Sequence, residues 1–426
     1  MSSTTRPANY TMSIVIIGVL FFIFGFVTWL NGTLIPFLKL ACDLQSDAQA
    51  LLVTFAFYMA YFFLAIPSSM ILEKTGFKNG MSLGLATMGV GALLFIPAAM
   101  DRTFSLFLAG LFIQGMGLSL LQTASNPYIS VIGPLESAAS RISIMGICNK
   151  VAGAISPLIL SAIVLRGASE IESKILITTD PSQRTILLEE LSRRVIMPYG
   201  IMAAVLIFLA IMIRYSSLPD IEAETDGQTT SESKNSIFQF PHLLLGSLCI
   251  FLYVGVEVMA GDVITIYGKA IGISLDEAKL FTSYTLWSMV FGYILGIFTI
   301  PRFVKQEKAL TLSAIVGILF SAGAYFSSGY TSIAFIALLG FANALMWPAI
   351  FPLAIDGLGK FTKIGSALLV MGISGGAIIP QVYGLLSATM GPPAAFFWIV
   401  LPCYLYILFY AQRGHRAGRA TAILSK

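Results

Sequence analysis

The sequence predicts an all-α integral membrane protein with twelve transmembrane helices in two pseudo-symmetric six-helix bundles. Three observations support this prediction. Hydrophobic residues make up 57% of the 426 residues and charged residues only 11%, whereas a soluble domain carries about 25% charged residues. Apolar stretches recur along the chain, and each approaches the ~20 residues that a helix needs to cross a bilayer. One long polar segment divides them into two sets of six, as in transporters built from two similar halves.

The predicted spans follow the apolar runs between polar, glycine-containing or proline-containing turns. They cover 12–38, 49–72, 80–99, 105–127, 139–165, 196–214, 242–267, 278–301, 308–326, 332–355, 364–388 and 394–412. The mean hydropathy of +0.86 agrees with so much membrane-embedded sequence. Residues 1–214 are therefore predicted to form the N-terminal bundle, 215–241 a cytoplasmic linker and 242–426 the C-terminal bundle.

Two polar segments lie outside the predicted spans. The linker carries five acidic residues between 220 and 232, a composition typical of a flexible tether, with a regulatory tail as the alternative. The segment 167–194 contains an amphipathic run at 185–195, which predicts a short surface helix. That helix is expected to serve either as a connector or as a lid.

The basic residues predict the orientation of the chain. With the N-terminus inside, fifteen of the 25 Lys and Arg residues lie on the cytoplasmic side and nine on the outer side. Five of those nine belong to the long segment 166–194, and long loops count less in the positive-inside rule. Both termini are therefore expected in the cytoplasm.

Catalytic and metal-binding patterns are absent from the sequence. The four cysteines are scattered without metal-ligand spacing, so we expect four free thiols, and the two histidines have no candidate catalytic partners. We therefore expect no enzyme activity, no cofactor and no nucleic-acid partner. The expected partners are the lipid bilayer and a small solute, and the protein is expected to be a monomer.

Polar residues within the spans indicate the transport pathway, because a polar group in hydrocarbon is costly unless it faces a cavity or another helix. Amides match the hydroxyl groups of a sugar, and indole rings offer flat apolar faces. No arginine lies deep in a span, so a neutral sugar is favoured over an anionic solute. For any single amide, an interhelical hydrogen bond is the alternative. The candidate substrate-binding residues are Asn31, Gln122, Asn126, Asn149, Trp287, Asn343, Trp347 and Gln381, with Trp29 as a further stacking face.

Three ionisable residues lie deep in the spans, where an unpaired charge costs at least ~2.5 kcal/mol. Glu257 lies near the middle of its span between two glycines that could break the helix, so it is the first candidate for cation coupling and the predicted metal ligand. Asp262 is the second candidate, with a solvent-wetted helix end as the alternative. Lys150 completes the candidate cation-coupling residues: it is expected to be an internal cation, either facing the cavity or paired with a carboxylate, and it could replace a travelling cation.

The motifs in these spans resemble those of the fucose–galactose–glucose:cation symporter family within the major facilitator superfamily. The resemblance covers nearly the whole chain. In the seventh span, the glutamate is similar to one in the glucose/galactose branch of that family. The motifs are Phe21–Phe26 with Leu30–Pro36, Gln122–Tyr128 with Gly133 and Pro134, Arg141–Asn149, Tyr253–Glu257, Pro348–Phe351 and Gly375–Pro380.

The resemblance implies the major facilitator fold in a bacterial inner membrane and transport by rocking of two halves around a central site. It also implies cation-coupled import of a hexose similar to glucose or galactose, with Asn149 as a sugar ligand. The fucose permease has carboxylates where this chain has Gly32 and Gln122, so a proton mechanism is not carried over and sodium is favoured. An uncoupled hexose facilitator, a transporter of a non-sugar solute and a non-transporting sensor remain alternatives.

Overall fold

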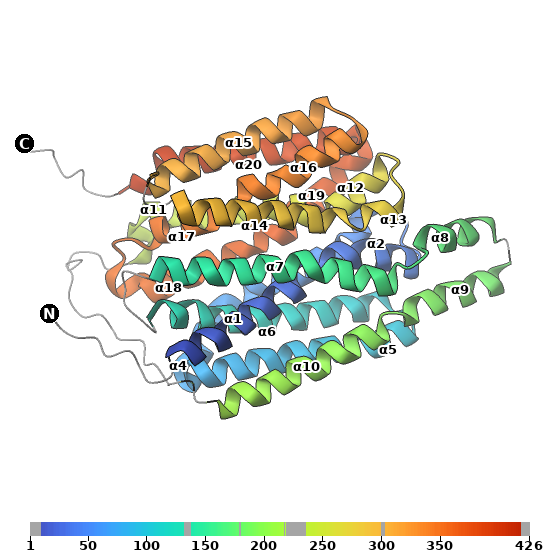
Figure 1. Cartoon of the computed structure of the whole chain (residues 1–426), viewed down its shortest axis with the longest axis horizontal. Coiled ribbons are helices and arrows are strands. Elements are labelled where there is room, and N and C mark those ends of the chain that lie inside the picture. The colour runs from blue at the N-terminus through green and yellow to red at the C-terminus, as the bar shows by residue number, and fades with distance from the viewer. Residues whose placement is uncertain are drawn as a thin grey trace, which may run out of the picture.

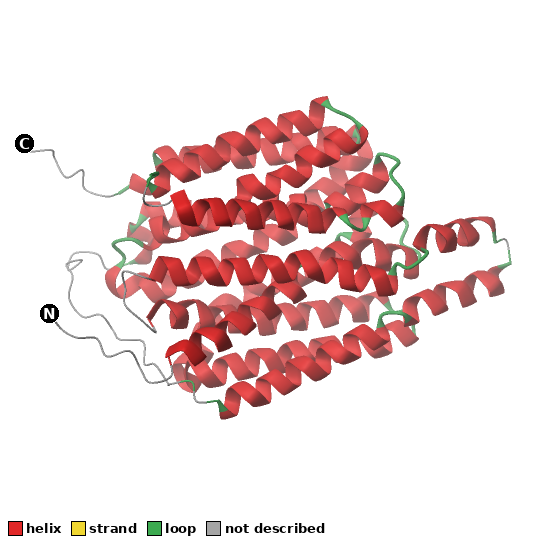
Figure 2. Cartoon of the chain, in the orientation of Figure 1, coloured by secondary structure: helices red, strands yellow, loops and turns green. Residues whose placement is uncertain are grey.

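The computed structural model describes residues 10–131, 138–178, 180–216, 218, 236–299 and 303–418. Every regular element within these ranges is a helix (Figure 2). The four cysteines are free thiols, as predicted. Most of the predicted linker, residues 219–235, lies outside the described residues. The division into residues 1–214, 215–241 and 242–426 therefore stays a prediction.

The helices follow one another with short connections. In the first half they are α1 (Tyr10–Thr28), α2 (Asn31–Ala41), α3 (Asp47–Ala50), α4 (Leu52–Leu93), α5 (Phe95–Met100), α6 (Phe104–Val131), α7 (Ala138–Val164), α8 (Ala168–Ile177), α9 (Pro181–Arg193) and α10 (Ile196–Tyr215). In the second half they are α11 (Pro241–Gly261), α12 (Ile264–Ala270), α13 (Leu275–Ala278), α14 (Phe281–Thr299), α15 (Gln306–Phe326), α16 (Gly329–Asn343), α17 (Met346–Ile355), α18 (Thr362–Met371), α19 (Gly375–Met390) and α20 (Pro392–Gln412).

Eleven helical stretches among the described residues are long and apolar enough to cross a membrane. The stretch Leu52–Met100 has 49 residues and contains two of the predicted spans. Gly76 lies between those two spans with φ of 74°, a left-handed conformation that glycine adopts without steric cost. The stretch therefore reverses direction at Gly76. With this pair counted separately, the twelve-helix prediction is confirmed.

The long helices run side by side, with α1–α10 forming one side of the molecule and most of the second half the other (Figure 1). The chain enters and leaves at the same end, which we call the inner end, following the predicted orientation. α8 and α9 project from the opposite, outer end, where a surface helix was predicted (Figure 1). The halves meet where α7 packs against α14 and where α4 packs against α18 and α19.

Two helices are broken at the same depth on facing sides of this interface. α1 ends at Thr28 and α2 resumes at Asn31, and α11 ends at Gly261 before α12. The indole of Trp29 lies between Gly153 and Gly261, where an added Cβ would come within 2.3 Å of ring atoms. Both glycines are therefore needed to hold Trp29 between the halves. Broken helices of this kind free backbone N–H and C=O groups near the bilayer midplane.

The outer end is closed by contacts between the halves. Lys269 of α12 forms an ion pair with Glu172 of α8. Lys279 donates to the carbonyl of Leu165 at 3.3 Å, and Gln381 donates to the carbonyl of Ala48 at 3.3 Å. Space for a solute between the halves is therefore expected on the inner side of these contacts.

Candidate functional site

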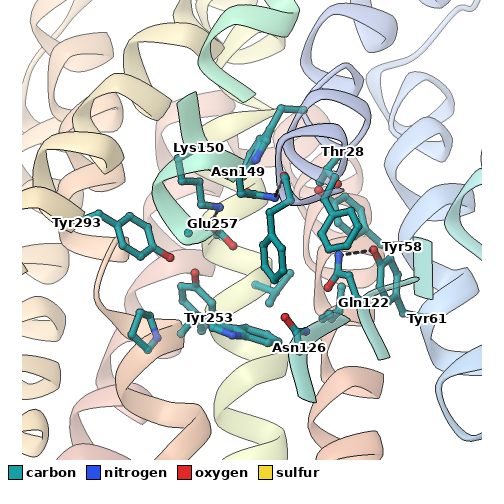
Figure 3. A pocket seen from close by; sticks show the side chains of 18 residues that line it. Thr28, Tyr58, Tyr61, Gln122, Asn126, Asn149, Lys150, Tyr253, Glu257 and Tyr293 are labelled. Carbon is teal, nitrogen blue, oxygen red and sulfur yellow. Dashed lines mark hydrogen bonds and ion pairs between the residues drawn. The ribbon is translucent and has the colours of Figure 1, made fainter. Parts of the chain in front are cut away.

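A cavity of about 140 Å³ lies between the two halves, inward of the helix breaks (Figure 3). Both halves contribute to it, through α1, α4, α6 and α7 on one side and α11, α14, α17 and the 3-10 helix Gly372–Ser374 on the other. Its polar and aromatic lining includes Thr28, Trp29, Tyr58, Tyr61, Gln122, Asn126, Asn149, Lys150, Tyr253, Glu257, Tyr293 and Trp347.

An ion pair joins the halves at the cavity wall. Lys150 Nζ on α7 lies 2.7 Å from Glu257 Oε1 on α11, and each side chain is 10% exposed. The same ammonium lies 4.6 Å from the centroid of the Trp29 ring, within the range of a cation–π contact. The carboxylate of Glu257 thus has an internal counter-ion. No group of three His, Cys, Asp or Glu residues able to hold a metal is found in the described part of the chain. The role of Glu257 as a cation ligand stays a prediction.

The amides of Gln122 and Asn149 are held by hydrogen bonds to the first half. Gln122 Nε2 lies 3.0 Å from the hydroxyl of Tyr61, and Asn149 Nδ2 lies 3.4 Å from the carbonyl of Phe21. α1 approaches α7 closely at Gly25, where a Cβ would lie 1.8 Å from the Asn149 carbonyl oxygen. A primary amide has two donor hydrogens and two acceptor lone pairs. Both side chains therefore keep capacity to bind a hydroxylated solute.

Aromatic rings supply flat faces around these polar groups. The rings of Tyr58 and Tyr61 are stacked with centroids 6.5 Å apart, and those of Trp347 and Phe351 with centroids 5.6 Å apart. The hydroxyl of Tyr293 faces Lys150 and Glu257 across the cavity (Figure 3). The site combines amides, hydroxyls, ring faces and one internally neutralised ion pair, so it suits a neutral polar molecule better than a charged one.

Half of the predicted substrate-binding residues line this cavity. Gln122, Asn126, Asn149 and Trp347 do so, together with Trp29, Lys150 and Glu257. The other four lie elsewhere, and the structure does not support a direct contact between them and a solute in this cavity. They are Asn31, Trp287, Asn343 and Gln381.

Each of these four has a local reason for its position. Trp287 is 46% exposed, on a face of α14 turned away from the cavity. Asn343 accepts a 2.9 Å hydrogen bond from the Tyr404 hydroxyl, the interhelical alternative considered for such amides. Gln381 belongs to the outer contacts. The Asn31 side chain is 1% exposed, and neither of its polar atoms has a hydrogen-bond partner among the described residues.

Sequence reasoning missed three of the four tyrosines that line the cavity, Tyr58, Tyr61 and Tyr293. Tyr58 and Tyr61 were not singled out, although residues three apart on a helix share a face and could have been read as a pair. Tyr293 also lies in an apolar run where aromatic residues facing lipid are common.

For Asp262, the sequence left open whether it is a coupling carboxylate or a solvent-wetted helix end. Asp262 is fully buried, so the second alternative is wrong.

The comparisons with known proteins agree with this architecture. The model of the Major Facilitator Superfamily matches residues 17–380. The chain belongs to the major facilitator superfamily. It is 32% identical over 419 residues to the glucose/galactose transporter of Brucella abortus, covering 98% of this chain and 97% of that protein. It is 28% identical over 413 residues to the L-fucose-proton symporter of Escherichia coli, covering 96% and 94% of the two chains.

The superfamily fold is also found in solved structures. The crystal structure of the major facilitator superfamily transporter FucP in the outward conformation matches with a TM-score of 0.72 and 29% identity, covering 95% of this chain and 98% of that one. These matches confirm the resemblance to the fucose–galactose–glucose:cation symporter family. The protein is a multi-pass membrane transporter and not an enzyme.

Proposed function

We propose that this transporter imports a neutral hexose similar to glucose or galactose by cation-coupled alternating access. The observation that carries the proposal is the lining of the central cavity: Gln122, Asn126 and Asn149 offer amides, tyrosines offer hydroxyls, and the single pair of charges cancels. Charged solutes would need a counter-charge that this lining does not supply. The names of the Brucella and Escherichia relatives support a sugar and a coupled cation.

In this mechanism the two halves rock around the cavity. The contacts of Lys269 with Glu172 and of Gln381 with Ala48 close the outer end while the solute can leave inward. When these contacts part and the inner ends approach, Asn149 and Trp347 would meet a solute arriving from outside. We place the protein as a monomer in a bacterial inner membrane with both termini in the cytoplasm.

Sodium remains our favoured coupling ion over the proton, because Gly32 and Gln122 provide no carboxylate in the first half of the interface. One observation favours a second candidate, an uncoupled hexose facilitator. Lys150 already neutralises Glu257 and could take the place of a travelling cation. Transport of a non-sugar solute by the same fold has no supporting feature in the cavity.

The proposal is tested by exchange of labelled sugar in proteoliposomes. Purified protein preloaded with unlabelled glucose or galactose should draw in labelled hexose, and unlabelled glucose or galactose should compete with it. Sugar phosphates and sugar acids should not compete. Exchange of a charged or lipophilic compound in the absence of any hexose exchange would contradict the proposed substrate class.

A further inference from the structure

Asp262 is a buried carboxyl group in the described interior that lacks an opposite charge. It follows the last residue of α11, it is 0% exposed, and neither carboxylate oxygen has a hydrogen-bond partner among the described residues. The Tyr58 hydroxyl and the Gly32 backbone N–H lie beside it but outside hydrogen-bonding geometry. An isolated ionised carboxylate in such a place is so costly that the group must be neutralised.

The position of Asp262 differs from that of the sugar cavity. The residue does not line the cavity. Tyr58, which does line it, lies beside the carboxyl group, and the Trp29 ring packs on Gly261, the residue before Asp262. Asn31, one position before Gly32, adds a second side chain that is almost fully buried and has unpartnered polar atoms among the described residues. A buried polar cluster, which we call the polar compartment, therefore lies just outward of the cavity.

Both halves build this compartment. Asp262 belongs to the second half, whereas Gly32 on α2 and Tyr58 on α4 belong to the first. Thr282 of the second half also contacts Gly32 so closely that a Cβ there would lie 2.3 Å from the threonine hydroxyl. α2 packs directly on α12 at the outer end. Separation of the outer ends would therefore open the compartment to the outer solution.

The charged groups around Asp262 do not neutralise it. Tyr58 on α4 is neutral in its ordinary state, Glu257 on α11 is a like charge, and Lys150 on α7 is already bound to Glu257. The Gly32 backbone N–H, in the first turn of α2, lies beside the carboxylate. The partial positive charge of a helix N-terminus helps an anion but does not supply a whole counter-charge. Closure of the outer end thus seals in an uncompensated negative charge unless a cation accompanies it.

We propose that Asp262 is the coupling carboxylate: it takes up a small monovalent cation, a proton or Na⁺, from the outer solution, and only the neutralised form is buried when the outer end closes. This inference rests on the proposed hexose transport and assigns its cation site. This assignment gives Asp262 and Glu257 different roles. Glu257 is already paired with the Lys150 ammonium and needs no cation from solution. Cation movement thereby becomes an obligatory part of outer closure.

The test uses the full-length Asp262→Asn variant in proteoliposomes, which keeps the shape of the side chain and removes its charge. Hexose exchange without gradients should stay within about twofold of the unmodified protein, since an uncharged side chain needs no cation when the outer end closes. Accumulation driven by an inward Na⁺ gradient or an inward proton gradient, applied separately, should be lost. The matched control Asp101→Asn, at an exposed turn of the outer end, should accumulate normally. The gradient that drives the unmodified protein identifies the ion.

A second measurement keeps this test independent of the sugar. The thermal stability of the unmodified protein in detergent should rise with added Na⁺ at constant pH, or with decreasing pH in the absence of Na⁺. The dependence should be absent from Asp262→Asn and present in Asp101→Asn. Absence of hexose exchange by the unmodified protein would refute the proposed function alone. Gradient-driven accumulation by Asp262→Asn, or an unchanged cation dependence of its stability, would overturn the assignment of Asp262.

Discussion

Two carboxylates five positions apart, Glu257 in α11 and Asp262 directly after its last residue, have different surroundings. Glu257 lines the central cavity and is held by Lys150 from the other half of the molecule. Asp262 lies behind the cavity, fully buried and without a hydrogen-bond partner among the described residues. Both were read from the sequence as deep anions of the same span. The difference lies in what the opposite half places against each of them.

This contrast indicates how one interface can serve a neutral solute and a charged ion. The Lys150–Glu257 pair keeps the cavity polar without a net charge, a condition that favours hydroxyl groups. In the proposed mechanism, Asp262, whose carboxylate oxygens have no hydrogen-bond partner among the described residues, leaves one charge to be compensated each time the outer end closes. The proposed sugar site and the proposed cation site are therefore distinct, and Trp29 and Tyr58 lie between them.

The largest expected effect comes from breaking the pair at the cavity. Lys150→Met should destabilise the protein by about 3–5 kcal/mol, because it leaves Glu257 buried without its counter-ion. The thermal unfolding midpoint in detergent measures this loss. The double variant Lys150→Met/Glu257→Gln should recover most of the stability, because it removes both charges. A double variant no more stable than the single one would show that the pair is not the source of the loss.

Removal of a sugar ligand should have the next largest effect. Asn149→Ala should weaken hexose binding roughly tenfold or more, the equivalent of the ~1–3 kcal/mol lost with a buried hydrogen bond. Titration of the purified protein with glucose or galactose measures the change. Asn79→Ala, whose amide lies at the inner end beside Arg214, is the matched control and should bind normally. Equal affinity in both variants would remove Asn149 from the binding site.

Removal of an ion pair between the halves at the outer end should have a smaller effect, on how often that end opens. The Lys269–Glu172 side chains are about 30% exposed, so their ion pair is worth no more than ~1 kcal/mol. Glu172→Gln should raise the rate at which maleimide labels a cysteine placed at Ala48 by at most about fivefold, because the outer end opens more often. The charge-swapped variant Glu172→Lys/Lys269→Glu should restore slow labelling. Labelling that the single change leaves unaltered would indicate that other contacts hold the outer end shut.

The smallest effect is expected from an indole outside the cavity. Trp287 is 46% exposed, on the face of α14 that is turned away from the cavity. Trp287→Phe should change hexose affinity by less than ~0.5 kcal/mol, as for other surface substitutions. Trp347→Phe, in contrast, alters the cavity lining and should weaken binding measurably. The opposite order of effects would return Trp287 to the list of sugar ligands.

The spans could be predicted because the bilayer demands long apolar runs, and those runs are visible without any tertiary information. Hence the Gly76 reversal lies between two predicted spans, and α9 lies close to the surface helix predicted at 185–195, whereas α8 was not predicted. Gln122, Asn126 and Asn149 could also be found, because amides in apolar runs are conspicuous. All three line the cavity.

The remaining details depend on how helices are rotated and paired. Trp347 and Trp287 are the same residue type in similar runs, yet only the first faces the cavity. A pairing of Lys150 with a carboxylate was one expectation, but its partner Glu257 is 107 residues away in the sequence, so local patterns could not identify which carboxylate it binds. The isolation of Asp262 is likewise a property of the assembled interface.

The most direct test of this account is the cation dependence of hexose affinity in Glu257→Gln and Asp262→Asn. Ligands that share one conformational equilibrium change each other's affinity by the same factor. The hexose dissociation constant of Glu257→Gln should therefore still fall when the coupling cation is added, even if binding is weaker. That of Asp262→Asn should not change with the cation. A cation response lost in Glu257→Gln and kept in Asp262→Asn would contradict the division of roles between the two carboxylates.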